Sequence, residues 1–320
     1  MKEKTMNVLL CIDDLKWDYT RHCAVTILSL LDTNKKHKIK IYIMSSCLPQ
    51  ENINELKRIV DLYDQKIEFI IRDNLIPKEV KESVINRRNL TRWTWYRLFF
   101  PLYIKDIERL LYIDCDVIIT KDIGEIYNMD MQWKAIAWYY DINLTRYVSE
   151  KNFESKNYIN AWVILIDTEK FKKHKIDKTN IEKINDKYWK YIDNADQDYL
   201  NIIFKDDIYI YGREMNYLVE KPFWNKWIKD ASIYHCLAKN YIQNSLCPKR
   251  LCDIYYHYLD QTKRSDLKYQ KRIIYFWFLY DYFYQWLLFI FNNTIWIKYF
   301  KKVHDSLSKI YLYWVKIIKR

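Results

Sequence analysis

The sequence predicts an α/β fold: a mixed, mainly parallel sheet with flanking helices, followed by a helical tail rich in aromatic and basic residues. Short apolar runs of strand length alternate with helical patterns along most of the chain, which is typical of βαβ units. Two of these runs end in pairs of carboxylates, and the composition changes sharply after residue 262. We therefore expect one large domain at residues 1–262 and a separate tail at residues 263–320.

The N-terminal half alternates regularly between the two patterns. Runs rich in Val, Ile and Leu have the length of strands, and the segments between them carry apolar residues at helical spacing. The predicted order is strand 8–12, helix 22–31, strand 39–44, helix 51–63, strand 67–71 and an aromatic helix 93–103.

Polar residues mark the predicted elements that follow. Asp141 comes just after one short strand, Asn160 lies at the start of the next, and His235 lies in the last. Open α/β sheets bind ligands beyond the ends of their strands, so these residues are candidates for a site. The predicted order is strand 109–119, strand 135–138, strand 158–166, a helix that opens in the polar cluster 194–201, and strand 232–236.

The most informative segment is the apolar run that carries Asp114 and Asp116, one residue apart. Residues i and i+2 of a strand point to the same side, so both carboxylates are expected to project from the end of a buried strand. Two like charges at that distance repel each other unless a cation lies between them. The divalent ions Mg²⁺ and Mn²⁺ suit carboxylate oxygens, and an acidic pair in a solvated turn is the plain alternative.

Asp13 and Asp14 form a second acidic pair at a predicted strand end, which favours a ligand site at this edge of the sheet. Asp196 also fits the first turn of a helix, where the helix dipole favours an acid. His235 also fits an ordinary structural histidine in an apolar strand. The other histidines have no acidic or cysteine cluster near them in the sequence, and we expect them to be structural: His22, His37, His174, His257 and His304.

Glycine and cysteine usage exclude several classes of site. The chain has only two glycines, Gly124 and Gly212, so it contains neither a Walker A loop nor a Rossmann fingerprint. A bound nucleotide would need a metal ion and side chains to hold its phosphates. The seven cysteines include no C-x-x-C pair and lie partly in apolar runs, which predicts reduced, buried thiols. With no signal peptide evident, these features predict a cytoplasmic protein.

In their order and spacing, these segments resemble the retaining glycosyltransferases of family 8 over roughly residues 6–240. That group contains bacterial lipopolysaccharide galactosyl- and glucosyltransferases and the glycogenins. The resemblance implies a GT-A fold, a divalent metal ion and a UDP-sugar donor. The matching pieces are Asp13-Asp14, Arg97 in the aromatic helix, Asp114-Cys115-Asp116, Asp141, Asn160-Ala161, Asp196-Gln197-Asp198 and His235.

Carried over by position, the resemblance implies three groups of site residues. Mn²⁺ or Mg²⁺ would be held by Asp114, Asp116 and His235. Asp196 and Gln197 would be the catalytic residues at the transferred sugar. Asp13 would contact the uracil base, and the whole donor site would comprise Asp13, Asp14, Arg97, Asp141, Asn160, Ala161 and Lys239.

Two departures from the family pattern stand out. Trp162 follows Asn160-Ala161 where the family usually has glycine, which adds an indole near the sugar site. The late family motif runs His-x-x-Gly-x-x-Lys-Pro-Trp, whereas residues 235–241 contain neither glycine nor proline. Lys239 stands two positions early in that motif, and its expected contact with the diphosphate depends on this altered spacing.

The tail combines twelve Lys and Arg residues against three acids with a strongly aromatic stretch at 273–291. As a helix, that stretch would be about 28 Å long, close to the thickness of a bilayer. Asp281 in its middle, a narrow polar stripe and the aromatic load argue against a span and favour a helix lying in the cytoplasmic leaflet, on anionic headgroups. A buried helical hairpin is the alternative. Nucleic acid is not an expected partner, because the basic residues flank an apolar stretch.

Together these inferences predict a metal-dependent retaining glycosyltransferase, peripheral on the inner face of the plasma membrane. It would move galactose or glucose from a UDP-hexose donor to a lipid-linked or cell-surface saccharide of the lipopolysaccharide-core or capsule type. One alternative is a sugar nucleotidyltransferase, which normally needs the Gly-rich loop that is absent here. Another is a catalytically decayed GT-A-fold protein that binds saccharides or serves as a membrane scaffold.

Overall fold

The computed structural model describes residues 5–16, 19–78, 80, 92–139, 153, 158–194, 196–211, 216–218, 231–235 and 249–263. Contacts divide the chain into two compact units. The first unit, Met1–Leu218 with Asp230–His235, carries both sheets. The second, Val219–Lys229 with Cys236–Arg320, contributes the helix α11 (Lys249–Leu259) to the described residues. The predicted boundary at residue 262 stays a prediction, because residues 264–320 lie outside the described part of the chain.

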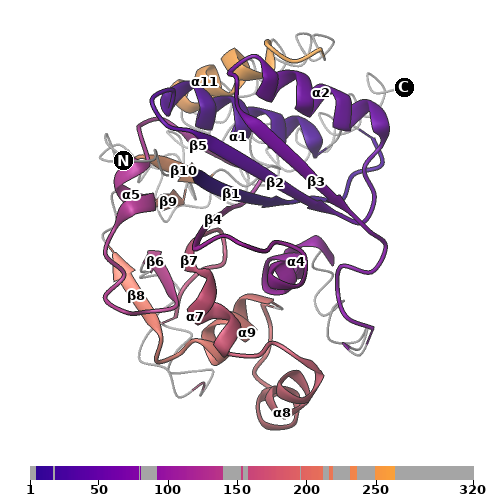
Figure 1. Cartoon of the computed structure of the whole chain (residues 1–320), viewed down its shortest axis with the longest axis vertical. Helices are drawn as coiled ribbons and strands as arrows, with labels where there is room; N and C mark the ends of the chain where they lie inside the picture. Colours follow the sequence, from indigo (N-terminus) through magenta and orange to yellow (C-terminus); the bar gives the residue numbers. More distant parts are fainter. Residues whose placement is uncertain are drawn as a thin grey trace, which may run out of the picture. The chain divides into compact units, whose positions relative to one another are not determined.

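A seven-stranded mixed sheet forms the centre of the first unit, in the order β3-β2-β1-β4-β7-β6-β8 (Figure 1). Neighbouring strands are parallel except around β7, which runs antiparallel to β4 and β6. This confirms the predicted mixed, mainly parallel sheet. The strands are β1 (Met6–Cys11), β2 (Ile39–Ser45), β3 (Lys66–Ile71), β4 (Arg109–Ile113), β6 (Ile136–Tyr139), β7 (Val163–Asp167) and β8 (Ile208–Tyr211).

A second, three-stranded sheet has the order β5-β10-β9. Its strands are β5 (Val117–Ile119), β10 (Ile233–His235) and β9 (Asn216–Leu218), with β10 antiparallel to β5 and parallel to β9. Strands β4 and β5 are consecutive in the chain but belong to different sheets. The short turn between them therefore joins the two sheets.

Helices lie on both faces of the large sheet. Figure 1 shows α1 and α2 over one face of β1, β2 and β3, and α4 on the opposite face. Strand β1 is almost entirely buried, as expected for a central parallel strand covered on both sides. The helices of this unit are α1 (Thr20–Thr33), α2 (Gln50–Asp61), α4 (Tyr96–Phe99), α5 (Gly124–Asn128), α7 (Thr168–Lys173), α8 (Lys178–Tyr188) and α9 (Asp196–Ile203).

Most predicted elements agree with the structure to within about two residues at each end, and three differ by more. The run 109–119 is two strands separated by a turn, and the strand expected at 158–166 begins only at Val163. The aromatic helix expected at 93–103 consists of α4 flanked by two 3₁₀ turns, η2 (Arg92–Trp95) and η3 (Phe100–Leu102). Pro101 lies in the second turn, where its missing N–H prevents continuation of the α-helix.

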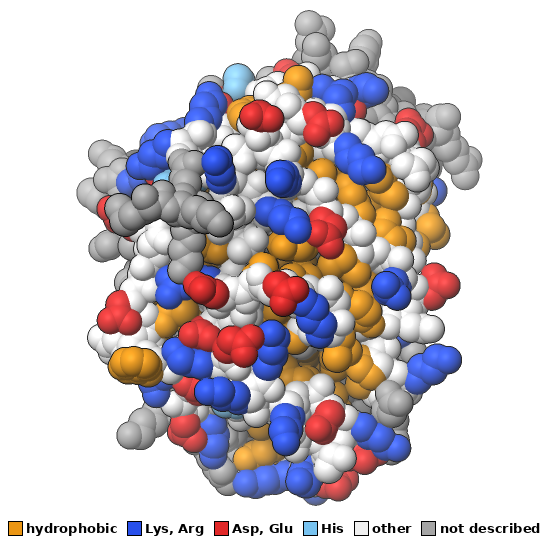
Figure 2. All heavy atoms as spheres, in the orientation of Figure 1, with side chains coloured by type: hydrophobic (Ala, Val, Ile, Leu, Met, Phe, Trp, Pro, Cys, Tyr) orange, Lys and Arg blue, Asp and Glu red, His pale blue; other side chains and the backbone are white. Residues whose placement is uncertain are grey.

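The outer surface mixes basic and acidic side chains, and Figure 2 shows an apolar band among them over the edge strand β3. All residues of β3 except Ile70 are exposed or half-buried. In the part of the chain that the structure describes, no helix is long and apolar enough to cross a membrane. The aromatic stretch 273–291 lies outside the described residues.

The thiols of the described residues agree with the sequence prediction of reduced, mostly buried cysteines. All five are free, and only Cys47 is half-buried rather than buried. No disulfide is therefore formed within this part of the chain. These cysteines are Cys11, Cys23, Cys47, Cys115 and Cys252.

Two of the histidines expected to be structural pair with an acid that lies far away in the sequence. His37 Nε2 lies 3.0 Å from Asp122 Oδ1, and His174 Nε2 lies 2.8 Å from Asp207 Oδ2. The partners are 85 and 33 residues away in the chain. No local sequence pattern reveals contacts of that range. His304 lies outside the described residues.

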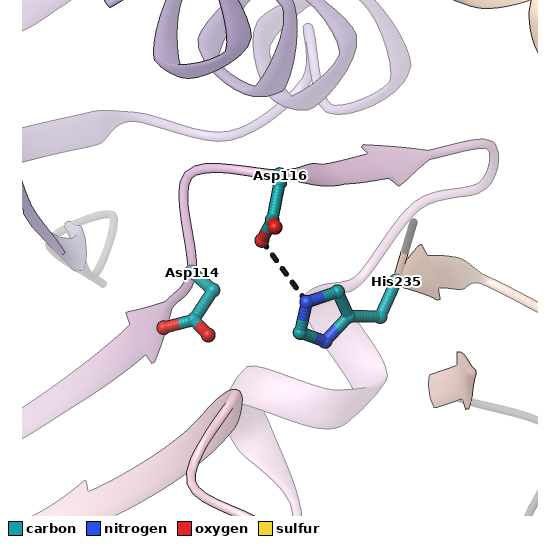
Figure 3. Close-up of side chains that lie close together, drawn as sticks. All are labelled: Asp114, Asp116 and His235. Carbon is teal, nitrogen blue, oxygen red and sulfur yellow. Dashed lines mark ion pairs between the residues drawn. The ribbon is translucent and has the colours of Figure 1, made fainter. Parts of the chain in front are cut away.

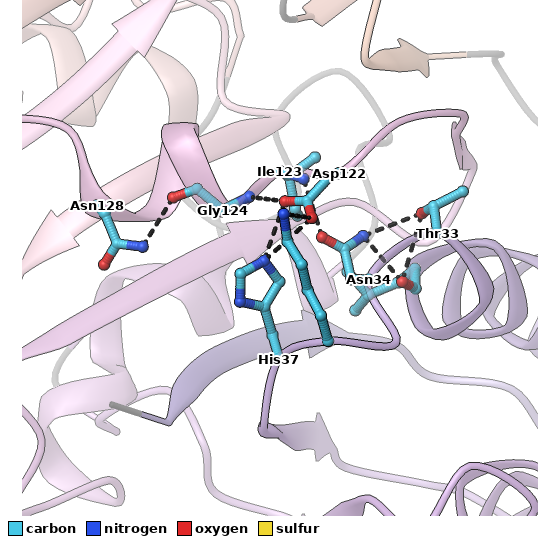
Figure 4. Close-up of polar contacts among 9 residues, drawn as sticks. Thr33, Asn34, His37, Asp122, Ile123, Gly124 and Asn128 are labelled. Carbon is cyan, nitrogen blue, oxygen red and sulfur yellow. Dashed lines mark hydrogen bonds and ion pairs between the residues drawn. The ribbon is translucent and has the colours of Figure 1, made fainter. Parts of the chain in front are cut away.

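A polar cluster around Asp122 ties the end of α1 to the start of α5 (Figure 4). The Asp122 carboxylate accepts hydrogen bonds from Gly124 N at 2.7 Å and from Lys36 Nζ at 2.9 Å, in addition to its contact with His37. Asn34, which follows α1, accepts a hydrogen bond from Ile123 N at 2.9 Å. These bonds satisfy main-chain donors at the first turn of α5.

The absence of a side chain at Gly124 allows this close approach. A Cβ at position 124 would lie 2.6 Å from His37 Nε2 and 2.9 Å from Asp122 Oδ1, well inside van der Waals contact. One of the two glycines of the chain therefore serves to pack the cluster and not to bind phosphate.

Replacing Asp122 by Asn should weaken the fold in a pH-dependent way. Partial burial would raise the pKa of Asp122, but hydrogen bonds from Gly124, Lys36 and His37 lower it to about 2. Because this folded-state pKa lies below the unfolded value, the carboxylate stabilises the fold at neutral pH and loses that contribution as the pH falls toward 2. With allowance for solvent screening, we expect a loss of about 1 kcal/mol of unfolding free energy at pH 7.

Urea denaturation of parent and Asp122→Asn proteins at pH 7 and pH 3 measures this effect. The difference between them should shrink by about half at pH 3. Asp186→Asn, on the exposed side of α8, is the matched control and should change stability little. A difference that stays constant between the two pH values would contradict the prediction.

Candidate active site

The turn between β4 and β5 carries Asp114 and Asp116. The structure corrects the expectation that both lie in one strand: β4 ends at Ile113 and β5 begins at Val117. The two carboxylates approach each other because the chain bends from one sheet into the other, and not because of strand alternation. Figure 3 shows both side chains directed toward the same space.

Hydrogen bonds from neighbouring elements fix the main chain of this turn. Asp114 N donates to the carbonyl oxygen of Trp162 at 2.8 Å, one residue beyond the end of the β4–β7 ladder. The hydroxyl of Thr26 on α1 lies 2.9 Å from the carbonyl oxygens of both Cys115 and Val117. The turn is thus held from the sheet on one side and from α1 on the other.

Strand β10 brings His235 to the turn from far along the chain. In the antiparallel pair of β5 and β10, His235 lies opposite Val117, the residue after Asp116. Its Nε2 is 3.0 Å from Asp116 Oδ1 (Figure 3). One potential ligand atom from each of Asp114, Asp116 and His235 lies within 4.8 Å of the other two. The structure therefore brings together the three residues expected to hold a metal ion.

Burial and charge both act on this cluster. The side chains of Asp114, Asp116 and His235 are 18%, 8% and 1% exposed. Burial raises the pKa of Asp114, against the opposing effects of Arg97 and His235. Burial alone would lower the pKa of His235, but the carboxylates of Asp116 and Asp114 raise it overall.

The donor set fits a divalent cation. Two shielded carboxylates so close together require positive charge, and one oxygen from each with an imidazole nitrogen suits Mn²⁺. Mg²⁺ prefers oxygen ligands and is the less natural occupant of a site with histidine. A ligating imidazole must be unprotonated at the nitrogen that binds the ion, so metal binding at His235 would compete with protonation.

Arg97 lies buried between two carboxylates. Its Nε is 3.0 Å from Asp196 Oδ2, and its Nη1 is 3.3 Å from Asp114 Oδ1. The guanidinium also donates to the carbonyl oxygens of Thr94 and Ala161. Arg97 therefore links α4, α9, the segment before β7 and the Asp114 turn.

The charge states of this pair follow from the same contacts. Burial would lower the pKa of Arg97, but Asp196, Tyr112 and Asp114 raise it overall, so the guanidinium stays charged. Burial raises the pKa of Asp196 to about 6, against the attraction of Arg97. At neutral pH the carboxylate of Asp196 is therefore ionised and paired.

The residues before β7 are held against the start of α9. Ala161 N donates to Gln197 Oε1 at 2.9 Å, and Gln197 Nε2 donates to the Tyr158 hydroxyl at 3.1 Å. The side chain of Asn201 pairs with both main-chain groups of Ile159 at 2.8 Å. These bonds place Asn160 and Ala161, predicted for the donor site, beside Asp196 and Gln197, predicted to be catalytic.

The two carboxylates after β1 have different surroundings. Asp13 accepts hydrogen bonds from Ser46 N and from the Tyr96 hydroxyl, both at 2.6 Å. Asp14 Oδ2 accepts from Tyr19 N at 2.8 Å, from Thr20 N at 2.7 Å and from the Thr20 hydroxyl at 2.8 Å. Asp14 thus fixes the start of α1, a structural role that the sequence did not indicate.

Comparisons with known proteins agree with this geometry. The sequence profile described as glycosyl transferase family 8 matches residues 7–276. The chain belongs to glycosyltransferase family 8. General stress protein A of Bacillus subtilis is 26% identical over 280 residues, which make up 82% of this chain and 96% of that protein. The lipopolysaccharide 1,2-glucosyltransferase of Escherichia coli is 24% identical over 248 residues, or 73% of this chain and 71% of that protein.

Solved structures share the fold of this family 8 chain. An active-site variant of LgtC superimposes with a TM-score of 0.69 at 18% identity, covering 83% of this chain and 100% of that one. The galactosyltransferase LgtC with donor and acceptor sugar analogs gives a TM-score of 0.65 at 17% identity, with the same coverage. GlyE of Streptococcus pneumoniae TIGR4 gives 0.58 at 19% identity, covering 87% of this chain and 64% of that one. These likenesses confirm the predicted GT-A fold.

Two predicted donor-site residues of the family 8 pattern, Asp141 and Lys239, lie outside the described residues.

One residue that sequence reasoning missed is Tyr112, whose hydroxyl donates to Asp114 Oδ1 and whose ring lies 4.5 Å from the Arg97 guanidinium. Its position two residues before Asp114 was an available signal. Thr26 carried no signal, because its contact with the turn depends on how α1 packs.

Replacing Arg97 by Lys in this glycosyltransferase should destabilise the fold strongly. An ammonium group cannot reach Asp196, Asp114 and two carbonyl oxygens at once, so buried acceptors lose their donors. We expect a loss of about 2 kcal/mol or more of unfolding free energy, measured by urea denaturation at pH 7.

Arg58→Lys is the matched control for that measurement. Arg58 donates two hydrogen bonds to the buried carboxylate of Glu55 on α2, but 33% of the Arg58 side chain is exposed, so its replacement should cost less than that of Arg97. Equal losses of unfolding free energy for the two variants would contradict the prediction, because the buried contacts of Arg97 would then contribute no more than those of a half-exposed ion pair.

Proposed function

We propose that this family 8 glycosyltransferase is a metal-dependent retaining enzyme that transfers a hexose, galactose or glucose, from a UDP-sugar to a saccharide acceptor. The observation that carries the proposal is the Asp114, Asp116 and His235 cluster, whose ligand atoms lie within 4.8 Å of one another. The cluster lies inside the region that matches the family profile. Family 8 enzymes use a divalent metal ion and a nucleotide-sugar donor, which gives the cluster its chemical purpose.

In this proposal, Asp114, Asp116 and His235 hold Mn²⁺ or Mg²⁺. A bound ion would neutralise the charge that develops on the UDP leaving group as the glycosidic bond breaks. Asp13 accepts a hydrogen bond from the uracil base, with its carboxylate already oriented by Ser46 and Tyr96. The other donor-site residues are Asp14, Arg97, Asp141, Asn160, Ala161 and Lys239.

Asp196 and Gln197 are the proposed catalytic residues. The transferred sugar gains positive charge at its anomeric carbon as the bond breaks, and an ionised carboxylate stabilises that charge. Asp196 is ionised at neutral pH and anchored by Arg97. The amide of Gln197 is oriented by Ala161 and Tyr158, so its orientation is fixed before substrate arrives.

We further propose a lipid-linked or cell-surface saccharide as the acceptor, of the lipopolysaccharide-core or capsule type. Similarity to the lipopolysaccharide 1,2-glucosyltransferase of Escherichia coli supports this class of acceptor. The basic and aromatic composition of residues 263–320 supports a peripheral position on the inner face of the plasma membrane. There the enzyme would meet an amphiphilic acceptor in the cytoplasmic leaflet.

A catalytically decayed saccharide-binding or scaffold protein is the second candidate. It is favoured by one observation, the presence of Trp162 where the family usually has glycine, in contact with the ring of His235. The sugar nucleotidyltransferase alternative has no comparable support, because the chain lacks a Gly-rich nucleotide loop.

UDP release by the purified chain, with a panel of UDP-sugars and a saccharide acceptor, tests the enzyme proposal. We expect one UDP-hexose to be turned over with Mn²⁺, and the rate to fall about 100-fold or more with a chelator or with Asp116→Asn. Asp186→Asn, on the exposed side of α8, is the control and should keep full activity. Metal-dependent UDP binding without turnover of any donor would favour the decayed protein.

Sedimentation with lipid vesicles tests the proposed role of the tail. The full chain should sediment with vesicles that contain anionic lipid and should be released by about 0.5 M salt, because screening weakens contacts between lysines and headgroups. A chain truncated after residue 262 should stay in the supernatant. Sedimentation of the truncated chain at the same level as the full chain would show that the tail is not the membrane-binding segment.

A further inference from the structure

Trp162 contacts two of the three residues proposed to hold the metal ion. Its carbonyl oxygen accepts the hydrogen bond of Asp114 N at 2.8 Å. Its indole packs edge to face with the ring of His235, with ring centroids 4.3 Å apart and an angle of 84° between the planes. Trp162 thus joins the end of the large sheet, at β7, to the small sheet, at β10.

One ring nitrogen of His235 makes no hydrogen bond within the described residues, so the contact with Trp162 is important for the orientation of the ring. Nε2 faces Asp116, whereas Nδ1 is buried and has no hydrogen-bond partner among the described residues (Figure 3). A histidine that binds a metal usually donates its second ring N–H to a carboxylate, carbonyl or water, which fixes the ring orientation. For His235, the Trp162 indole occupies the role that such a hydrogen bond normally fills.

The contact would matter most when an ion is bound. A cation at the cluster would take the Nε2 lone pair, and the direct contact of His235 with Asp116 would no longer orient the ring. The edge-to-face contact with Trp162 does not require the contact of Nε2 with Asp116, so it can persist when a cation binds at Nε2. Such aromatic pairs are worth about 1 kcal/mol beyond their burial. A glycine at this position would leave the ring without it.

We propose that Trp162 is a positioning residue, which holds the His235 imidazole in the orientation that binds the divalent cation. The inference rests on the proposed metal site and goes beyond it, because it assigns a role to a residue that departs from the family pattern. In this proposal the tryptophan at position 162 supports the metal site, whereas in the decayed-protein alternative it marks the loss of activity.

Mn²⁺ affinity of the full chain, measured without donor by the electron paramagnetic resonance signal of free Mn²⁺, tests the proposal. Trp162→Ala removes the indole but keeps both main-chain groups, including the acceptor for Asp114 N. We expect Trp162→Ala to weaken Mn²⁺ binding about 10-fold, and Trp162→Phe, which keeps an aromatic ring, to stay within about 3-fold of the parent. Trp162→Leu fills the space without a ring and should behave as Ala, which covers the case of an unfolded Ala variant.

Trp133→Ala is the matched control, since Trp133 is 88% exposed, and its affinity for Mn²⁺ should equal that of the parent. Parental affinity in the folded Ala or Leu variant would overturn the proposal. Parental affinity with an increased KM for the donor would also overturn it, and would make Trp162 a sugar-contacting residue. No Mn²⁺ binding by the parent chain itself would overturn the proposed metal site, an outcome that is visible before any variant is compared.

Discussion

The ion pairs of Arg97 hold the centre of this molecule together. A guanidinium that is 3% exposed lies between Asp114 and Asp196 and also donates to two main-chain carbonyls. Either carboxylate without it would be a shielded negative charge with a strong tendency to take up a proton. By keeping Asp196 ionised at neutral pH and drawing the Asp114 turn toward α9, Arg97 sets both the electrostatics and the geometry of the site.

The site is assembled at the junction of two sheets, and each sheet contributes part of it. The large sheet ends in Asp114 at β4 and in Trp162 beside β7, and the small sheet contributes His235 from β10. Asp116 lies in the bend that joins them. Such an arrangement needs no Gly-rich backbone to approach a phosphate, which agrees with a chain that has only two glycines. One of the two glycines, Gly124, packs against the ring of His37.

Much of the fold could be predicted from the sequence because apolar periodicity reports local structure directly. The alternation of strands and helices from β1 to β3 was predicted correctly because the apolar runs of the strands and the apolar faces of the helices are both visible in the sequence. The three residues proposed to bind the metal ion were predicted from the order of motifs shared with family 8, since nothing local to His235 distinguishes it from a structural histidine. The β4–β5 turn was predicted to be part of a strand because the residues on both sides of it are equally apolar. Composition does not show that β4 and β5 pair within two different sheets.

What the sequence could not supply is long-range pairing. The contacts of His37 with Asp122 and of His174 with Asp207, and the anchoring of the turn by Thr26, join residues far apart in the chain. Asp14 shows the related difficulty at short range. It stands beside Asp13 in an acidic pair, yet its oxygens are engaged by the start of α1, so two adjacent residues of one type have different tasks.

The size of the small sheet has a consequence for folding. Its three strands are three residues each, and a sheet that short is marginal in isolation. Pairing β10 with β5 also closes a long loop, at an entropic cost. An ion that joins His235 to the two aspartates would therefore act as a removable cross-link, much as a disulfide does in an oxidised protein. Through mass action, a bound ion would then stabilise the closed form of the small sheet.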